Sequence, residues 1–524
     1  MASMRVSRRR LLQGTGAIAG AAFLPQAAKS APAASSGLQI GPNLYESIGV
    51  VPVVNCRGTF TIISGSLTLP EVKHAMDEAG KHYVNMDELM DGVGARLAAL
   101  TKAPWGVVTA GCAAALTNTT LACIAGTNPE RMERIPKLAG MKNEVIIPKH
   151  SRNVYDHAVR MPNVDIIEVN TVPELENSIN PRTALIMMMA SPRLDHDELN
   201  VETICRIAKA RGVPTIVDAA AEFLTIPNKY LEKGSTLVAY SGGKCLRGPQ
   251  CAGLLLGQKD LCKAAWFNSA PHHAFGRSLK VGKEEIMGML AAVEMWTQRD
   301  HDAEWKQWQS WIDSIAETVK SVPGVTTEVH KPEDLSNYAP VLRIKWDGAA
   351  LGITGKEVEE TLANGRPRIL VAGSSGMRPD NMASSVSIMP YMMQPDDYKI
   401  ASHALHAVLS NPPKFENPVR PSGEPSAIAG NWSVKVDYAL GSAHHTITII
   451  QNGNMLAGFH EGETVGGDLR GAIYGNQVHF RSHHPIQGTA IGYEFTGTVD
   501  GNNMGGDINM GEYGPARWSA VKRG

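Results

Sequence analysis

Residues 214–222 read Pro214-Thr215-Ile216-Val217-Asp218-Ala219-Ala220-Ala221-Glu222, an apolar run that ends in a carboxylate. A second apolar run, Thr236–Tyr240, leads into Ser241-Gly242-Gly243-Lys244-Cys245-Leu246-Arg247-Gly248-Pro249-Gln250. Short apolar runs bounded by small residues are typical of buried strands in a parallel sheet. The sequence therefore predicts two strands that carry Asp218 and Lys244 at or just beyond their ends.

The same alternation of short apolar runs and longer amphipathic stretches extends from about residue 43 to 410, which predicts an α/β fold with a mainly parallel sheet. The expected strands are 106–109, 144–147, 164–169, 184–188, 214–217, 236–240 and 253–256. Apolar residues that recur every three or four positions predict helices at 113–125, 201–210 and 283–296. A small α+β domain is expected from a long helix within 297–325, strands at 341–346 and 368–371, and a helix at 396–409.

A different kind of sequence follows a Pro- and Ser-rich linker at 411–425. Glycines there separate short alternating runs such as 446–450, 477–480 and 493–498, which predicts an antiparallel β-barrel or sandwich. This domain holds the histidine pairs His444-His445 and His483-His484, and also His460 and His479. Adjacent strand residues point to opposite faces, so we expect solvent-exposed histidines rather than a metal site.

The N-terminus has the order of a bacterial export signal. Ser7-Arg8-Arg9-Arg10-Leu11-Leu12-Gln13 precedes an apolar stretch at 14–24 and a run of small residues at 27–36. The arginine pair resembles the twin-arginine signature, and an ordinary secretory signal is the alternative; either predicts a periplasmic or secreted protein. The expected division of the chain is 1–36 export signal and spacer, 43–300 large domain with the N-terminal segment, 301–410 small domain, 411–425 linker and 426–524 β domain.

Charge and cysteine content exclude several classes of function. The chain has 524 residues with 50 Lys and Arg against 51 Asp and Glu, a net charge of -1, so no global field attracts nucleic acid. After the signal, no apolar run is long enough to span a bilayer, and the seven cysteines include no C-x-x-C pair. We therefore expect no nucleic-acid partner, no membrane span in the mature protein and no metal.

Lys244 and Asp218 together indicate one kind of chemistry. A lysine on a Gly-rich loop, with small neighbours that let a flat ring approach, is what a Schiff-base site requires. A strand-end aspartate can hold a pyridinium nitrogen protonated, as pyridoxal phosphate needs. Anion binding is expected at Thr109-Ala110-Gly111-Cys112-Ala113-Ala114-Ala115, because the backbone N–H groups of Gly111 to Ala113 open a helix there and Ser241 can add a hydroxyl.

Residues 43–410 resemble the selenocysteine synthase family of fold-type-I pyridoxal-phosphate proteins, and more closely its branch similar to D-glucosaminate-6-phosphate ammonia-lyase. The resemblance rests on the Asp218 and Lys244 segments, on the 109–115 segment and on three further ones. These are Val54-Asn55-Cys56-Arg57-Gly58-Thr59, His150-Ser151-Arg152-Asn153-Val154-Tyr155-Asp156 and Gly276-Arg277-Ser278-Leu279-Lys280-Val281-Gly282-Lys283-Glu284. The export signal, the lack of a basic surplus and the extra β domain depart from the family and argue against a tRNA substrate.

The resemblance implies roles for particular residues. Lys244 carries the cofactor as a Schiff base and Asp218 pairs with the ring nitrogen, while Gly111, Cys112, Ala113 and Ser241 hold the phosphate. His150 either lies against the ring face or sits in a surface loop. Arg277 and Arg152 either bind a substrate carboxylate or phosphate or form surface ion pairs, and Arg368 in the small domain is an alternative carboxylate ligand.

The predicted function is a pyridoxal-phosphate-dependent enzyme that acts on a small amino acid or amino sugar acid, most simply by α,β-elimination of the ammonia-lyase type. Transfer of the selenocysteine-synthase type, transamination and racemisation begin with the same proton abstraction and stay open. A non-catalytic ligand-binding protein is a further alternative. The family resemblance also implies a homo-oligomer.

Overall fold

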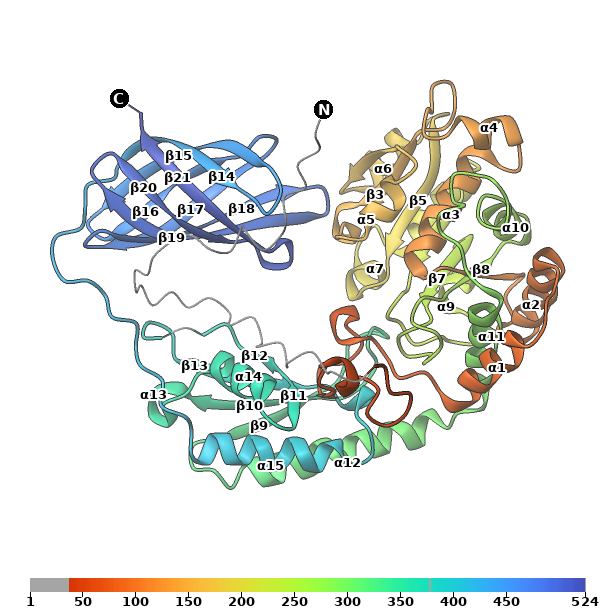
Figure 1. Ribbon diagram of the computed structural model, residues 1–524. Coiled ribbons are helices and arrows are strands. Elements are labelled where there is room, and N and C mark those ends of the chain that lie inside the picture. The colour runs from red at the N-terminus through yellow and green to blue at the C-terminus, as the bar shows by residue number, and fades with distance from the viewer. Residues whose placement is uncertain (1–36, 377, 524) are drawn as a thin grey trace, which may run out of the picture.

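The computed structural model describes residues 37–376 and 378–523, and the predicted export signal lies outside them. Figure 1 shows three parts: a large α/β domain, a small domain flanked by two long helices, and a C-terminal β-barrel. The buried apolar side chains of these parts form three main and separate clusters. No helix in the described ranges combines the length and hydropathy needed to cross a bilayer.

The large domain is built on a seven-stranded sheet with the order β2-β8-β7-β6-β5-β3-β4. Only β8 runs antiparallel to its neighbours in this sheet. The strands are β2 (Gly106–Thr109), β3 (Glu144–Pro148), β4 (Asp165–Val169), β5 (Thr183–Met189), β6 (Thr215–Asp218), β7 (Leu237–Ser241) and β8 (Gly253–Gly257). Each lies within about a residue of its predicted bounds, and the mainly parallel α/β fold is confirmed.

Helices cover both faces of this sheet, as Figure 1 shows. Among them α8 has the apolar spacing that predicted it, because Val201, Ile204, Cys205 and Ala208 are buried on one side. The central helix α3 is buried along nearly its whole length, which its Ala- and Thr-rich sequence permits. The helices are α1 (Pro70–Gly80), α2 (Met86–Thr101), α3 (Cys112–Ala125), α4 (Pro129–Arg134), α5 (Asp156–Arg160), α6 (Val172–Ser178), α7 (Pro192–His196), α8 (Val201–Ala210), α9 (Lys229–Glu232), α10 (Lys259–Phe267) and α11 (Lys283–Gln298).

The small domain is an antiparallel sheet of order β12-β13-β10-β9 with helices packed on it. Its elements are α12 (His301–Val319), β9 (Thr326–His330), β10 (Val341–Asp347), α13 (Gly348–Leu351), α14 (Gly355–Asn364), β11 (Arg368–Leu370), β12 (Ala372–Gly373), β13 (Ala383–Ile388) and α15 (Asp397–Ser410). The N-terminal strand β1 (Val53–Asn55) pairs in parallel with β11, and Cys56 is buried in the small-domain core. The sequence placed this segment with the large domain, whereas its pairing and packing belong to the small one.

The C-terminal part is a closed barrel of eight antiparallel strands, each paired with the next and β14 with β21. Its strands are β14 (Gly430–Asp437), β15 (Ser442–Asn452), β16 (Met455–Glu461), β17 (Gly466–Tyr474), β18 (Gln477–Ile486), β19 (Thr489–Asp500), β20 (Asn503–Asn509) and β21 (Pro515–Lys522). Alternate residues point inward, and Trp432, Phe480, Phe495 and Trp518 fill the interior. Of the two predicted architectures, the barrel is confirmed.

The barrel interior corrects the expectation that its histidines are exposed. His444 and His483 are exposed, but their neighbours His445 and His484 point inward and are buried, as is His460. His445 Nδ1 lies 2.9 Å from His460 Nε2, and His484 Nε2 lies 3.0 Å from His460 Nδ1. Each contact uses a different nitrogen of the central ring, so the three imidazoles form a hydrogen-bonded chain. No metal-binding group of His, Cys, Asp and Glu is present in the described part of the chain.

Candidate active site

A cavity of about 650 Å³ opens at the edge of the large sheet where the parallel strands end. Ligand sites of open α/β sheets form at this edge, because the loops that follow the strands meet there. Six of the residues predicted to bind the cofactor line the cavity: Gly111, Cys112, Ala113, Asp218, Ser241 and Lys244. They come from the ends of β2, β6 and β7 and from the start of α3.

Asp218 is the last residue of β6 and is almost completely buried. Its Oδ1 accepts hydrogen bonds from the Ala220 N–H at 3.0 Å and from the Cys112 thiol at 3.4 Å. Burial raises the pKa of Asp218, and these two donors and the charge of Lys244 offset only part of that rise. Since both donors are neutral, a cationic N–H inside the cavity would stabilise the carboxylate further.

Cys112 is positioned to orient that carboxylate. Burial raises the pKa of its thiol well above the usual value, and the neighbouring negative charge of Asp218 raises it again. The side chain therefore stays a protonated donor toward Asp218 at neutral pH.

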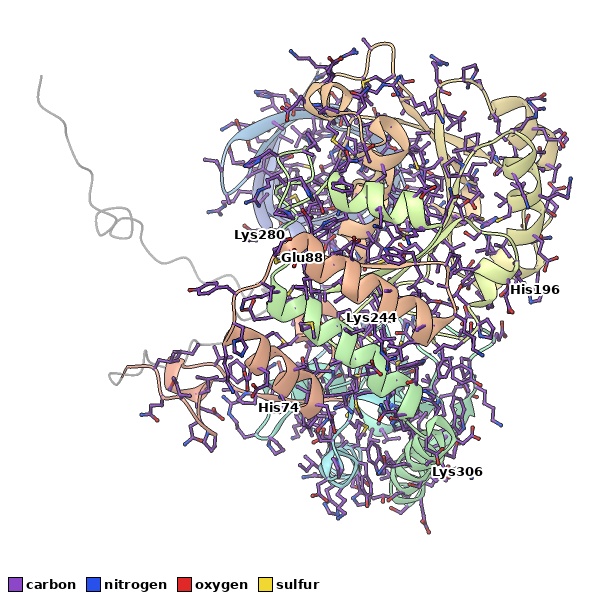
Figure 2. The ribbon with its side chains drawn as sticks, turned by 90° about the vertical axis from the view of Figure 1, so that its right-hand side faces the viewer. His74, Glu88, His196, Lys244, Lys280 and Lys306 are labelled. Carbon is purple, nitrogen blue, oxygen red and sulfur yellow. The ribbon has the colours of Figure 1, made fainter. Side chains whose placement is uncertain are left out.

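Lys244 stands on the loop between β7 and β8. In Figure 2 it lies behind helices α2 and α11, and it is partly buried, whereas the other five labelled side chains are exposed. The glycines before it are required by close packing: a Cβ at Gly243 would lie 2.0 Å from Gln250 Oε1, and one at Gly242 2.8 Å from the Ala252 carbonyl oxygen. The Gly-Gly-Lys sequence thus lets the loop fold tightly against residues 249–252 while the lysine reaches the cavity.

The turn from β2 into α3 provides an anion-binding end to the same cavity. Gly111 has φ +88°, a conformation that favours glycine, and its carbonyl accepts a hydrogen bond from the Thr109 hydroxyl at 2.8 Å. The first N–H groups of the 14-residue helix α3 have no intrahelical acceptor, and the helix dipole favours negative charge there. Gly253 packs so closely on this turn that a Cβ would lie 2.3 Å from the carbonyl carbon of Gly111.

Four further residues predicted to act at the site do not line this cavity. His150 hydrogen-bonds the Leu199 carbonyl oxygen at 3.2 Å and the Ser151 hydroxyl at 3.1 Å. Arg277 is exposed on the loop before α11, and Arg368 donates from Nε to the Ala363 carbonyl oxygen at 2.7 Å. Their roles stay predictions from the resemblance.

Arg152, the fourth of them, is engaged at all three guanidinium nitrogens. Nε contacts Asp156 Oδ2 at 2.5 Å, Nη1 contacts Glu168 Oε2 at 3.1 Å and Nη2 contacts Gln487 Oε1 at 3.0 Å. A substrate carboxylate would have to displace one of these partners. Its substrate-binding role also stays a prediction.

The sequence reasoning missed several cavity residues. Tyr155 lines the cavity and is five residues beyond His150, within a segment already singled out. Thr61, Thr68, Lys73 and Met76 also line it. That stretch carries no sequence signal, because it is brought to the site by backbone hydrogen bonds: Ser66 N–H donates to the Gly243 carbonyl and Leu69 N–H to that of Arg247.

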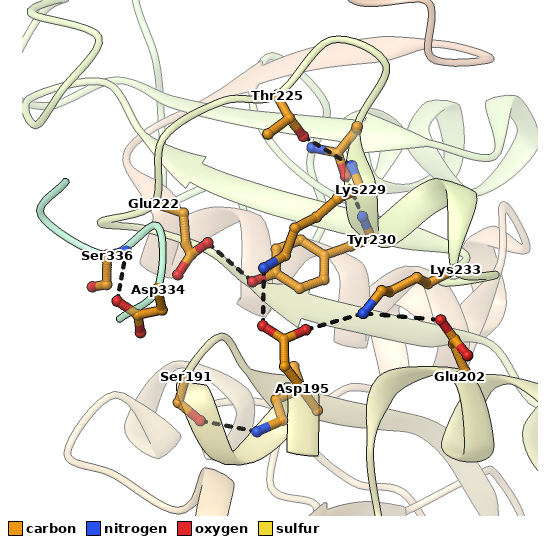
Figure 3. A network of polar contacts seen from close by, with 12 residues as sticks. Ser191, Asp195, Glu202, Glu222, Thr225, Lys229, Tyr230, Lys233, Asp334 and Ser336 are labelled. Carbon is orange, nitrogen blue, oxygen red and sulfur yellow. Dashed lines mark hydrogen bonds and ion pairs between the residues drawn. The ribbon is translucent and has the colours of Figure 1, made fainter. Parts of the chain in front are cut away.

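Glu222, four residues beyond Asp218, is buried and links the large and small domains. The hydroxyl of Tyr230 donates to its Oε2 at 3.0 Å (Figure 3), and the other carboxylate oxygen has no hydrogen-bond partner. Burial raises the pKa of Glu222 to about 7. Its backbone forms an isolated antiparallel bridge with Ser336 of the small domain. The segment that follows Asp218 is therefore bonded both to Tyr230 of the large domain and to the small domain.

Comparison with known proteins gives a consistent family signal. The model of the aminotransferase class-V family matches residues 97–349, just under half of the chain. A D-glucosaminate-6-phosphate ammonia lyase of Salmonella typhimurium is 27% identical over 334 residues, which is 62% of this chain and 88% of that protein. The solved structure of a D-glucosaminate-6-phosphate ammonia-lyase superimposes with a TM-score of 0.62 at 25% identity, covering 71% of this chain and 99% of that one. The chain is a pyridoxal-phosphate-dependent enzyme of fold type I.

Two further relatives carry other activities in their names. A 5'-C-glycyluridine monooxygenase-decarboxylase of Streptomyces is 28% identical over 62% of this chain and 83% of its own length. An L-seryl-tRNA(Sec) selenium transferase of Proteus mirabilis is 25% identical over 49% of this chain and 58% of its own length. The family likeness therefore does not by itself fix the reaction.

The cavity fits pyridoxal phosphate on its own chemistry. The amine of Lys244 suits the aldehyde, the buried carboxylate of Asp218 suits a pyridinium N–H, and the start of α3 suits the phosphate. All three features line the same cavity of about 650 Å³. The cofactor would also pair with the buried carboxylate of Asp218, which is otherwise costly to bury.

Proposed function

We propose that this enzyme catalyses α,β-elimination from a small amino acid or amino sugar acid. The α-proton and a β-substituent leave the substrate, and water then hydrolyses the resulting imine to a 2-oxo acid and ammonia. The observation that carries the proposal is the shared cavity of Lys244, Asp218 and the start of α3. The reaction type is taken from the ammonia lyase of Salmonella typhimurium, since the match spans 88% of that protein.

Each of the cavity residues would have a separate role in this reaction. Bound pyridoxal phosphate supplies an electron sink for the carbanion at the substrate α-carbon. Lys244 Nζ takes the α-proton and can return it to the leaving group. Asp218, oriented by Cys112 and Ala220, accepts the ring N–H and keeps that nitrogen protonated. The first amides of α3 and the Ser241 hydroxyl hold the phosphate.

Other outcomes of the same proton abstraction are transfer to an added nucleophile, transamination and racemisation. Selenium transfer is the less favoured of these, because the match to the selenium transferase covers 58% of that protein. Product analysis with and without an added thiol or selenium donor separates elimination from transfer.

The decisive test is covalent trapping followed by a substrate screen. The purified protein is expected to show the visible absorption of a lysine-bound cofactor, and borohydride should fix the adduct on Lys244. Lys244→Ala should abolish both absorption and ammonia release, while the exposed control Lys280→Ala leaves them intact. An adduct on another lysine, or ammonia release by Lys244→Ala, would refute the assignment. A protein that neither absorbs nor releases ammonia would instead be the ligand-binding alternative.

Location and assembly are part of the same proposal. The sequence at 1–36 supports twin-arginine export to the periplasm, which detection of the processed protein in a periplasmic fraction would test. Two large apolar side chains, Phe60 and Ile62, are exposed on either side of the cavity residue Thr61, which supports a homo-oligomer that covers them. Light scattering of the purified protein tests that assembly.

A further inference from the structure

One hairpin of the C-terminal barrel, the turn of Gln487 and Gly488 between β18 and β19, contacts the large domain. Gln487 Oε1 accepts a hydrogen bond from Arg152 Nη2 at 3.0 Å. A Cβ at Gly488 would lie 2.3 Å from the Asn153 carbonyl oxygen and 2.6 Å from Asp156 Oδ2, so only glycine fits in this contact. In Figure 1 this end of the barrel lies beside α5 and β3.

The segment under the hairpin, Ser151–Asp156, is the loop that follows β3. It is a tightly bonded unit: Asn153 Oδ1 accepts from the Tyr155 N–H at 2.7 Å, and Asn153 Nδ2 donates to the Ser151 carbonyl oxygen at 2.9 Å. Arg152 and the buried Asp156 form an ion pair across the same turn. Displacement of Asn153 is therefore transmitted to the next bonded residue, Tyr155.

Tyr155 is the point at which this loop reaches the cavity of Lys244 and Asp218. Its side chain is 52% exposed, which places it at the mouth rather than in the buried floor. A residue at the mouth contacts the incoming substrate more than the enclosed cofactor.

We propose that the Gln487-Gly488 hairpin is a positioning element of the active site, which holds Tyr155 against the cavity through Asn153 and so sets the affinity for substrate. The barrel is then part of the substrate-binding wall. The inference rests on the proposed function for its substrate, but the contact itself can be tested without one.

The first experiment uses the full chain and hydrogen exchange. Gly488→Val should accelerate exchange of the amides at 153–158 by about fivefold or more, because the hairpin can no longer seat on Asn153. Gly492→Val, in strand β19 just after the turn, is the matched control, since its Cβ meets only ordinary contacts, the nearest being His483 Nδ1 at 3.5 Å. Equal exchange in the two variants would show that the hairpin does not hold the loop.

The second experiment separates positioning from simple damage. With a substrate from the screen, Gly488→Val should raise KM by about fivefold while kcat changes less than about twofold and the cofactor absorption is unchanged. Gln487→Ala should raise KM less, and Gln477→Ala at the other end of β18 should not change it. In a Tyr155→Ala background the KM effect of Gly488→Val should vanish.

These outcomes keep the two proposals distinct. Faster exchange with an unchanged KM, or a KM effect that persists without Tyr155, would overturn the positioning role while leaving the reaction assignment intact. If the enzyme catalyses a reaction other than elimination, the same variants are compared by the KM of that reaction. The hydrogen-exchange experiment does not depend on which reaction is catalysed.

Discussion

Acidification should destabilise the C-terminal barrel through its buried imidazole chain. Burial and the neighbouring histidines lower the pKa of His460 from 6.5 to about 2, and burial also lowers that of His484. Because the folded pKa lies below the unfolded one, the stability these groups contribute is complete above about pH 6.5 and is lost as the pH falls below it.

The size of the effect follows from the pKa of His460. At about pH 4.5 the unfolded ring is protonated, with a pKa of 6.5, while the folded ring stays neutral. Two pH units below the unfolded pKa correspond to about 2.7 kcal/mol of lost stability from this one residue. His484 adds to the loss, so a barrel of ordinary stability would approach its unfolding limit.

The assay is native-state hydrogen exchange of the amides in β15, β16 and β18, measured in the full chain between about pH 7.5 and 4.5 after correction for intrinsic exchange. His460→Gln removes the titrating ring; it lowers stability at neutral pH but should flatten the pH dependence by about 2.7 kcal/mol. His444→Gln, on the exposed face of β15, should keep the wild-type slope. A His460→Gln slope equal to the wild-type slope would refute the argument.

Three more predictions concern the large domain. The pKa of Glu222 is about 7 in the folded protein against 4.5 in the unfolded chain, so the stability that its protonated carboxyl contributes is lost as the pH rises between these values. Glu222→Gln should therefore leave the free energy of unfolding nearly unchanged at about pH 5 and raise it by up to about 3 kcal/mol at about pH 8. Urea unfolding at the two pH values checks this. Gly253→Ala should lower stability by about 1–3 kcal/mol and weaken cofactor retention, because its Cβ would collide with Gly111; thermal unfolding is compared with Gly92→Ala, where no atom lies within 4 Å. Asp218→Asn should stabilise the cofactor-free protein and reduce the gain in melting temperature on adding pyridoxal phosphate, because a buried carboxylate that its two donors compensate only in part is gone; equal gains in both proteins would contradict the role of Asp218.

The sequence predicted much of the large domain because its strands are short, mostly apolar and separated by clear helices. Asp218 and Lys244 could be placed together for the same reason, since parallel strands end at one edge. Placing these two residues together requires only the direction of the strands and no knowledge of which side chains are in contact.

Other features depend on contacts that local sequence does not record. Thr61 and Thr68 reach the cavity because Ser66 and Leu69 hydrogen-bond the Lys244 loop, more than 170 residues away. His460 is followed by another polar residue, Glu461, in strand β16, and which of the two faces the interior is fixed only by the register of the closed barrel. The same register turns His445 and His484 inward to meet it.

Glycines occupy the joints between the distant segments that build this site. Gly243 meets Gln250 within the lysine loop, Gly253 meets Gly111 at the anion-binding turn, and Gly488 meets Asn153 between the barrel and the large domain. In each case an added Cβ would overlap an atom of the partner segment, so the glycine is needed for close approach rather than for a turn. The sequence shows these glycines plainly but not their partners. The cofactor pocket could therefore be inferred from the strand ends that carry Asp218 and Lys244 and from the start of α3, whereas the contact of the barrel with the Asn153 loop could not.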